Sequence, residues 1–258
     1  EPYNSEAWNL MAETYVALEM YPEALEAADY SLAINPLDSN AILMKANAYM
    51  RDEQMTPAIQ HYTQYLEKQP DDLSVQLSLA VCYNSTERFE EALAVLSKAE
   101  QYARKMPDRQ ADLSQIFLMR AYALSRQKKF REALKAMARA RELSNGQQSW
   151  QYDIAEGEIY LQNGQTKQAE GYFAEALSAS HEQGETLFNI ALAYSNAGYY
   201  DCAIDLLGDV WTLYGAQEGK FVVPYLADCY LNKNDMENFL LHLQLAPSCN
   251  LEATQHLF

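Results

Sequence analysis

Histidine and cysteine are the residues of this sequence most able to hold a metal ion or take part in catalysis, and there are four of each. The histidines are His61, His181, His242 and His256. They form no His-Glu-x-x-His zinc motif, and the sequence has no Gly-x-x-x-x-Gly-Lys-Ser/Thr phosphate loop and no Gly-x-Ser-x-Gly nucleophile elbow. We therefore predict that each histidine serves packing or the surface, and that the protein is not an enzyme and holds no metal or cofactor.

The four cysteines stand far apart in the chain and include no Cys-x-x-Cys pair. They are Cys82, Cys202, Cys229 and Cys249. This spacing argues against a disulfide scaffold and against a zinc knuckle. Because free cysteine behaves as a small apolar residue, we expect all four to be buried in the core.

The net charge of −17 is unevenly distributed along the chain. Residues 1–97 hold 4 Lys/Arg and 16 Asp/Glu, residues 98–141 hold 12 and 4, and residues 142–258 hold 3 and 16. Binding to nucleic acid depends on neutralising phosphates with Lys and Arg, so this excess of acid disfavours it. The expected partner is a protein or a peptide.

The basic segment contains a run that we expect on the outer surface of the fold. Its members are Lys128, Lys129, Arg131, Lys135 and Arg139. One interpretation is a solvated face with no further role. The other is a convex basic patch that contacts an acidic partner or a second copy of the chain, in which case self-association should weaken as salt rises.

The composition indicates an all-helical protein. The chain has 9 Gly and 8 Pro among 258 residues, and it is rich in Ala, Leu, Glu, Gln and Met. No stretch reaches the roughly 18 uninterrupted apolar residues of a membrane-spanning helix, and residues 1–10 do not resemble a signal peptide. We expect a cytoplasmic protein without membrane insertion.

The sequence repeats itself with a period near 34 residues. The phrases Pro22-Glu23-Ala24-Leu25, Glu90-Glu91-Ala92-Leu93 and Arg131-Glu132-Ala133-Leu134 set the register, which extends to seven repeats. These repeats span about 5–38, 39–72, 73–106, 114–147, 150–183, 184–217 and 220–253. We predict one continuous array over residues 1–258.

Three positions recur in every repeat or nearly so. The eighth is always small: Ala12, Ala46, Ala80, Ala121, Gly157, Ala191 and Ala227. The eleventh is aromatic with one exception: Tyr15, Tyr49, Tyr83, Leu124, Tyr160, Tyr194 and Tyr230. The twentieth is small except in the last repeat: Ala24, Ala58, Ala92, Ala133, Ala169, Ala203 and Phe239. This pattern predicts two antiparallel helices per repeat that approach closely at the small residues, with the aromatic ring beside the crossing.

Prolines and spacing add two expectations. Pro2 occupies the position that Pro36 and Pro70 hold at the ends of later repeats, so we expect a longer array with at least one more repeat before residue 1. The third and fourth repeats start 41 residues apart, which predicts an insertion around residues 105–112 that lengthens one helix and its connection.

The pattern resembles the tetratricopeptide repeat (TPR) family. The first repeat, with Trp8, Met11, Ala12, Tyr15, Ala24 and Pro36, matches it well, as does the fifth, with Gly157, Tyr160, Ala169, Phe173 and Ala176. The resemblance covers nearly the whole chain and implies a right-handed α-α superhelix of antiparallel helix pairs. The seventh repeat departs most, because Phe239 replaces the small residue.

The resemblance also implies a concave groove lined by the first helix of each repeat, at positions 2, 5, 9, 12 and 13. The candidates there are Asn9, Leu43, Asn47, Leu77, Asn84, Leu118, Tyr122, Arg126, Ile154, Glu158, Phe188 and Asn196. Amide side chains can donate to and accept from a peptide backbone, so such a groove suits a segment that is partly apolar and partly polar. The alternative is that the apolar stripe is core and its polar neighbours solvate the rim.

We therefore expect a non-catalytic scaffold that binds a peptide or helix of a partner protein in the groove. The alternative is an accessory or regulatory region of a larger enzyme or signalling protein whose active domain lies outside this chain. Members of the family that hold the acidic tails of chaperones have Lys at position 5 and Asn at position 9. Here position 5 is never Lys. In the first repeat position 5 is Asn9 and position 9 is Glu13, which disfavours that ligand.

Overall fold

The computed structural model describes residues 4–144 and 149–245, and within them it is helical with no strand. The predicted all-α class is therefore confirmed. The helices are α1 (Ser5–Ala17), α2 (Tyr21–Ile34), α3 (Ser39–Arg51), α4 (Met55–Lys68), α5 (Leu73–Ser85), α6 (Phe89–Ala103), α7 (Gln110–Arg126), α8 (Phe130–Leu143), α9 (Ser149–Gln162), α10 (Thr166–Ala179), α11 (Gln183–Asn196), α12 (Tyr200–Glu218), the 3-10 helix η1 (Gly219–Val222), α13 (Val223–Asn232) and α14 (Met236–Leu245).

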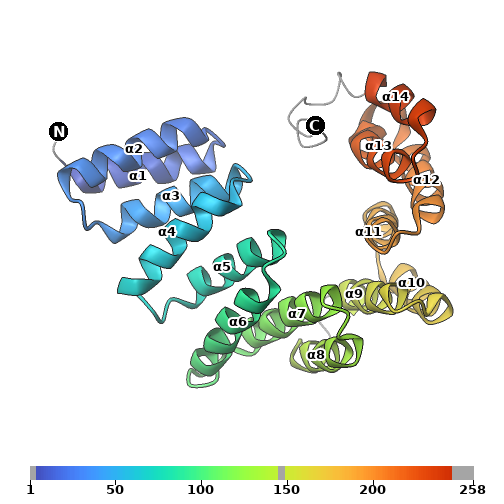
Figure 1. Ribbon diagram of the computed structural model, residues 1–258, viewed down its shortest axis with the longest axis horizontal. Coiled ribbons are helices and arrows are strands. Elements are labelled where there is room, and N and C mark those ends of the chain that lie inside the picture. Colours follow the sequence, from blue (N-terminus) through green and yellow to red (C-terminus); the bar gives the residue numbers. More distant parts are fainter. Residues whose placement is uncertain (1–3, 145–148, 246–258) are drawn as a thin grey trace. The chain divides into compact units, whose positions relative to one another are not determined.

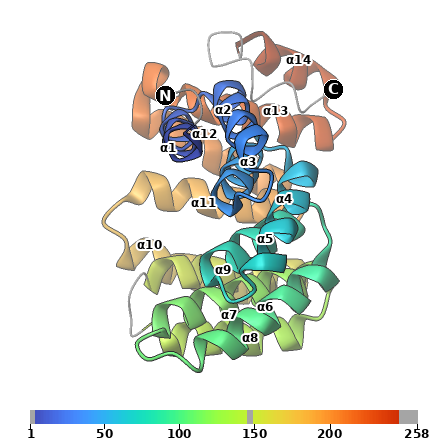
Figure 2. The same ribbon diagram turned by 90° about the vertical axis from the view of Figure 1, so that its left-hand side faces the viewer.

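The chain forms two compact units. The N-terminal unit is Glu1–Ser144 and the C-terminal unit is Asn145–Phe258. In the N-terminal unit α1 to α8 form four helix pairs that follow one another in chain order (Figures 1 and 2). In the C-terminal unit α9 to α14 form three pairs. In each pair the odd-numbered helix is called the first helix and the even-numbered one the second helix.

The starts of the helices follow the predicted register. In the first three repeats the first helices begin at Ser5, Ser39 and Leu73, where those repeats were expected to begin. The side chains of Asn4, Asp38 and Asp72 accept hydrogen bonds from backbone N–H groups in the first turns of these helices. Such caps satisfy donors that an isolated helix leaves unpaired, and they start each helix at a defined residue.

The turn inside each helix pair has one recurrent backbone conformation. The fifteenth residue of every repeat has a positive φ, between 57° and 85°: Glu19, Glu53, Glu87, Lys128, Gly164, Gly198 and Asn234. This left-handed residue reverses the chain after the first helix. Because the conformation is costly for a side chain other than Gly or Asn, its recurrence at Glu and Lys shows that packing of the pair enforces the turn.

The core of each pair lies at the predicted small residue. In the C-terminal unit a Cβ atom at Gly157 would lie 2.4 Å from Cε1 of Phe173, so the glycine makes room for that ring. In the N-terminal unit Ala46 lies in the same apolar cluster as Tyr62. Tyr62 follows Ala46 by sixteen residues, and Phe173 follows Gly157 by the same number. The small residue thus admits a large residue of the second helix.

The tyrosine at position 11 has a recurrent partner that explains two of the histidines. Tyr49 stacks on His61 with ring centroids 5.5 Å apart, and Tyr230 lies 4.9 Å from His242. Burial, together with the charge of Lys45, lowers the pKa of His61, which favours the neutral ring at pH 7. Both histidines therefore serve packing; His181 is exposed, and His256 lies outside the described residues.

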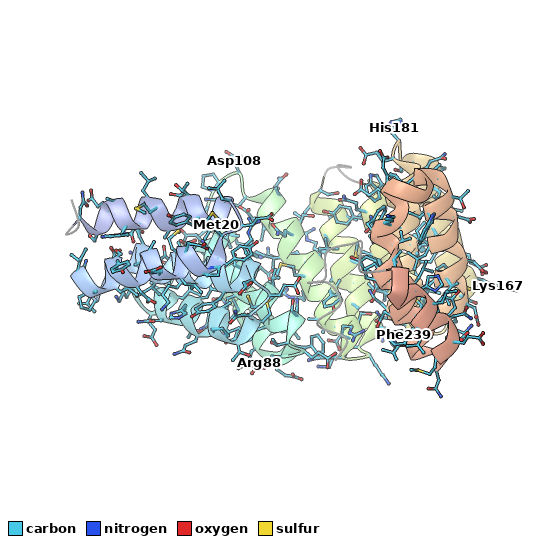
Figure 3. All side chains as sticks on the ribbon, turned by 90° about the horizontal axis from the view of Figure 1, so that it is seen from above. Met20, Arg88, Asp108, Lys167, His181 and Phe239 are labelled. Atoms are coloured by element: carbon cyan, nitrogen blue, oxygen red, sulfur yellow. The ribbon has the colours of Figure 1, made fainter. Side chains whose placement is uncertain are left out.

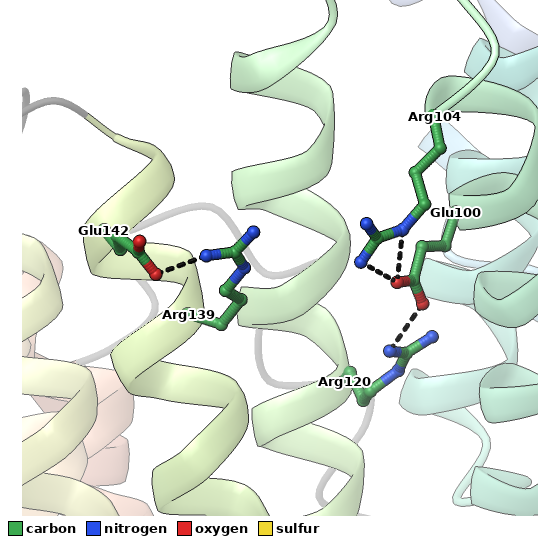
Figure 4. A network of polar contacts seen from close by, with 5 residues as sticks. All are labelled: Glu100, Arg104, Arg120, Arg139 and Glu142. Atoms are coloured by element: carbon green, nitrogen blue, oxygen red, sulfur yellow. Dashed lines mark hydrogen bonds and ion pairs between the residues drawn. The ribbon is translucent and has the colours of Figure 1, made fainter.

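The predicted insertion lengthens α7, which has 17 residues where α1, α3 and α5 have 13 each. An ion-pair network joins this helix to α6 (Figure 4). Glu100 accepts hydrogen bonds from Nε and Nη2 of Arg104 at 2.9 and 2.7 Å, and its other oxygen lies 2.7 Å from Nη1 of Arg120. Burial opposes ionisation of Glu100, but the two arginines outweigh it and lower the pKa of the carboxyl.

Side chains fill the space between paired helices in both units (Figure 3). Four of the labelled residues lie near the ends of two second helices, with Arg88 before and Asp108 after α6, and Lys167 and His181 near the two ends of α10. Within α12, Gly215 has φ 79° and ψ 170°, so the helix is interrupted four residues before Gly219, where η1 begins. This interruption changes the direction of the segment that leads to α13.

Candidate functional site

Among the described residues there is no group of three or more His, Cys, Asp or Glu side chains placed to hold a metal ion. The cysteines differ from expectation: Cys82 and Cys229 are buried, but Cys202 is exposed, and Cys249 lies outside the described residues. Burial raises the pKa of Cys82 to about 11, so that thiol stays protonated. In the part of the chain that the structure describes, no helix combines the length and apolarity needed to cross a membrane.

Three of the predicted groove residues are buried and therefore unavailable to a ligand. Leu77 and Ile154 are 9% and 7% exposed and belong to apolar clusters of their units, so for them the core alternative holds. Asn84 is also buried, and its Oδ1 has no hydrogen-bond partner among the described residues. Leu43 and Leu118 are half-buried.

Two predicted polar candidates of the N-terminal unit are engaged inside it. Asn9 donates a hydrogen bond of 2.9 Å to Asp38, the cap of α3, and Asn47 accepts one of 2.7 Å from the hydroxyl of Tyr62. Burial opposes ionisation of Asp38, yet the bonds from Asn9 and neighbouring groups lower its pKa. These amides therefore position helices.

An exposed surface of the N-terminal unit lies on α5 and α7. Val81 and Tyr122 occupy the ninth position of adjacent repeats and are 41% and 42% exposed. Arg126 lies one helical turn after Tyr122 on α7. It forms an ion pair of 3.3 Å with Glu87, which lies in the connection between α5 and α6. Val81 occupies one of the positions expected to line the groove, but it was not among the predicted groove residues.

The polar candidates of the C-terminal unit contact one another. Asn196 of α11 donates a 3.3 Å hydrogen bond to Glu158 of α9, which also accepts one of 3.1 Å from Gln162. Phe188 is half-buried and belongs to a larger group of aromatic residues.

This group, the aromatic cluster, consists of Phe188, Tyr214, Phe221 and Tyr225. Phe188 lies edge-on to Phe221 and Tyr225 with ring centroids 5.2 and 5.0 Å apart, and Tyr214 lies 5.5 Å from Phe221. Edge-to-face contact is the favourable geometry for such rings. Phe221 and Tyr225 nevertheless each remain 41% exposed, so the cluster combines fixed geometry with open apolar surface.

Two glycines build the aromatic cluster. A Cβ atom at Gly184 would lie 2.6 Å from Cε2 of Tyr214, so the absence of a side chain there lets the ring lie against α11. The positive φ of Gly215 interrupts α12 directly after Tyr214 and allows the chain to bring Phe221 back to the ring. Sequence reasoning missed this contact, although Phe221 stands at the second position of its repeat, one of the positions expected to line the groove.

The predicted basic patch lies on the turn before α8 and on α8 itself. Lys128, Lys129, Arg131 and Lys135 are exposed, whereas Arg139 is half-buried and forms an ion pair with Glu142 (Figure 4). Four of the five predicted cationic side chains thus remain at the surface.

Comparisons with known proteins agree with this architecture. The family model described as "TT21 fifth ARM repeats domain" matches residues 39–161, slightly less than half of the chain. A search of curated proteins found no match.

Solved structures resemble the chain at low sequence identity. A tetratricopeptide repeat protein from Parabacteroides merdae has a TM-score of 0.67 at 12% identity, covering 94% of this chain and 86% of that one. MamA from Desulfovibrio magneticus has 0.60 at 14%, covering 69% and 96%, and TTC0263 from Thermus thermophilus has 0.54 at 20%, covering 74% and 98%. The chain therefore has a TPR-like helical repeat fold.

Proposed function

We propose that the protein is a non-catalytic interaction scaffold whose first helices bind a segment of a partner protein, with the aromatic cluster as the principal contact. The observation that carries the proposal is the exposure of Phe221 and Tyr225 within a cluster whose ring contacts hold it in place. Aromatic side chains dominate binding energy at protein interfaces, since they bury a large area and have few rotatable bonds.

The expected ligand is a mixed segment with at least one large apolar side chain. Asp228 follows Tyr225 by three residues on α13, and Asn232 follows by one further turn, which places acid and amide groups near the cluster. A partner segment can therefore insert its apolar side chain among the rings while its backbone bonds to the polar groups.

A second contact is expected on the N-terminal unit at Val81 and Tyr122, the exposed pair on its first helices. That the two units form one continuous array, and that the basic patch mediates salt-sensitive self-association, remain predictions.

The test is quantitative capture of partners by the intact chain and by single variants. Tyr225→Ala should reduce retention of specific partners by about tenfold or more, as expected for an interface hot spot. Tyr122→Ala should have a smaller effect. Leu241→Ala, which removes a 53% exposed apolar side chain from α14, is the matched control and should retain them. Equal retention by wild type and Tyr225→Ala, with both folded by circular dichroism, would move binding away from the cluster.

A further inference from the structure

A cleft opens in the C-terminal unit between the second helices α10 and α12, with α11 as its floor. Its volume is about 380 Å³. The floor and walls are mainly apolar, with Phe173 and Leu177 from α10, Leu187 and Ile190 from α11, and Leu206 from α12. This is the size range of sites that take a small ligand or one or two large side chains.

The cleft exists because α10 leaves α11 partly uncovered. In the N-terminal unit each second helix packs extensively on the following first helix, whereas α10 packs much less on α11. The small side chains of Ala174 and Cys202, on opposite walls, widen the opening. The same gap explains why Cys202 is exposed although it was expected to be buried.

The cleft uses a different face of α11 from the aromatic cluster. Leu187, Ile190 and Tyr194 are spaced by three and four residues, and therefore share one helical face. Phe188, in the cluster, is turned about 100° from Leu187 around the helix axis. A ligand in the cleft would leave the aromatic cluster free.

The walls carry unneutralised acid. Glu170 of α10 and Asp205 of α12 both line the cleft and are exposed, and neither forms an ion pair within the described residues. Lys167 is the one Lys or Arg between residues 166 and 218. A positive group in a bound segment would therefore be attracted to both walls, and a negative one repelled.

Tyr194 supplies a hydrogen-bonding group at the floor. Its ring lies 5.2 Å from that of Phe173. Burial, together with the nearby Cys202 and Glu170, raises the pKa of its hydroxyl, which therefore stays neutral at pH 7.

We infer that this cleft is a second docking site, which takes a segment of a partner protein carrying one large apolar side chain flanked by Lys or Arg. The apolar side chain fills the space above Phe173, Ile190 and Leu206, and the cation lies between Glu170 and Asp205. The chain would then present two independent binding surfaces on one unit. The inference extends the proposed scaffold function but does not depend on the aromatic cluster.

The test is selection from a random peptide display library on the intact chain, followed by binding of the selected peptides to variants. Ala174→Trp fills the cleft from an exposed position, and Ala179→Trp places the same side chain on α10 outside it. Peptides with an apolar residue next to Lys or Arg should lose about tenfold or more in affinity for Ala174→Trp. They should bind Ala179→Trp and Tyr225→Ala as well as wild type, which separates this site from the aromatic cluster. Charge reversal at Glu170→Lys should weaken the same peptides.

Cys202 gives a direct readout of occupancy in a Cys249→Ser background. A bound peptide should slow alkylation of Cys202 by iodoacetamide. The inference is overturned if no selected peptide is sensitive to Ala174→Trp, if the sensitive peptides are acidic, or if bound peptide leaves alkylation unchanged. It is also overturned if the cleft is occupied by a second copy of the chain, seen as salt-sensitive dimerisation that Glu170→Lys abolishes.

Discussion

The two units join successive helix pairs through different contacts. In the N-terminal unit ion pairs join successive helix pairs, as in Lys45–Asp29 and Arg120–Glu100, both at 2.7 Å. In the C-terminal unit ring contacts also join successive pairs, as in Phe173–Tyr194 at 5.2 Å and Phe188–Tyr225 at 5.0 Å, beside an ion pair between Lys233 and Asp201. The repeat defines where backbones approach, but it leaves open which side chains hold neighbouring pairs together.

The same contrast holds at the turn inside each pair. The left-handed residue is Glu19, Glu53, Glu87 or Lys128 in the N-terminal unit, and Gly164, Gly198 or Asn234 in the C-terminal unit. Glycine and asparagine accept this conformation more readily than Glu or Lys. The N-terminal unit therefore carries more backbone strain in its turns.

The comparison indicates where binding should concentrate. Charged groups that form ion pairs within a unit keep its helices in register. Aromatic rings and unpaired carboxylates that are exposed at the surface can instead bind a partner. The C-terminal unit has both kinds of surface, on two sides of α11. The cleft surface is exposed because α10 packs less closely on α11.

The largest expected effect is on cysteine reactivity. At pH 8 iodoacetamide should alkylate Cys202 more than about 100-fold faster than Cys82, because the raised pKa of about 11 suppresses the Cys82 thiolate and burial blocks access. Peptide mass spectrometry over a time course measures both rates in one sample. Similar rates would show that Cys82 is as accessible to the reagent as the exposed Cys202.

Next in size is the effect of filling the space at Gly157. Gly157→Ala should lower the free energy of unfolding of the C-terminal unit by about 1–2 kcal/mol. The new methyl group displaces the Phe173 ring, and the loss of packing energy exceeds the gain from the higher helix propensity of alanine. Urea unfolding followed by Trp150 and Trp211 fluorescence, in a Trp8→Phe background, measures it. Adding Phe173→Leu recreates the pairing of Ala80 with Leu96 and should recover part of the loss; no recovery would show that the steric explanation is wrong.

The network at Glu100 should stabilise the N-terminal unit in a pH-dependent way. Glu100→Gln should cost about 1 kcal/mol at pH 7, because Arg104 and Arg120 lose a charged acceptor. The folded pKa of Glu100 is below its ordinary value of 4.5, so this stabilisation is present above pH 4.5 and is lost as pH falls through the lowered pKa.

Urea unfolding at pH 7 and pH 3, followed by Trp8 fluorescence in a Trp150→Phe and Trp211→Phe background, measures this. Glu91→Gln, at an exposed pair with Arg88, is the matched control and should leave stability unchanged. A Glu100→Gln variant with the same pH dependence as wild type would contradict the assignment.

The smallest effects are expected at the left-handed turns. Lys128→Gly should raise the melting temperature of the N-terminal unit slightly, by relieving strain worth about 0.5–1 kcal/mol. Gly198→Ala should lower that of the C-terminal unit by a similar amount. Thermal unfolding by circular dichroism, with Gly171→Ala as a control at an exposed helical glycine, checks both signs. Effects of the same sign in the two units would remove the proposed difference in strain.

Much of the fold could be predicted because the governing interactions are local or repeat exactly one helix pair apart. Ala46 and Gly157 mark the helix crossings, since that role demands a small residue. The caps Asp38 and Asp72 were not predicted, although aspartate is a residue type typical of a helix start. The candidate site was predicted less well. Leu77 and Tyr122 both occupy first helices, but the first is core and the second exposed, and this depends on how far the neighbouring helices cover each face.

The sequence alone determined a chain of antiparallel helix pairs, because small and aromatic residues recur at the spacing that this packing requires. Only the tertiary structure decided which side chains remain available. Gly215 returns Phe221 to Tyr214 and to Phe188, which stands more than thirty residues earlier in the sequence. The incomplete cover of α11 by α10 exposes Cys202 above an apolar cleft. Both outcomes depend on the angle at which one helix meets the next, which many side chains set together and no single motif encodes.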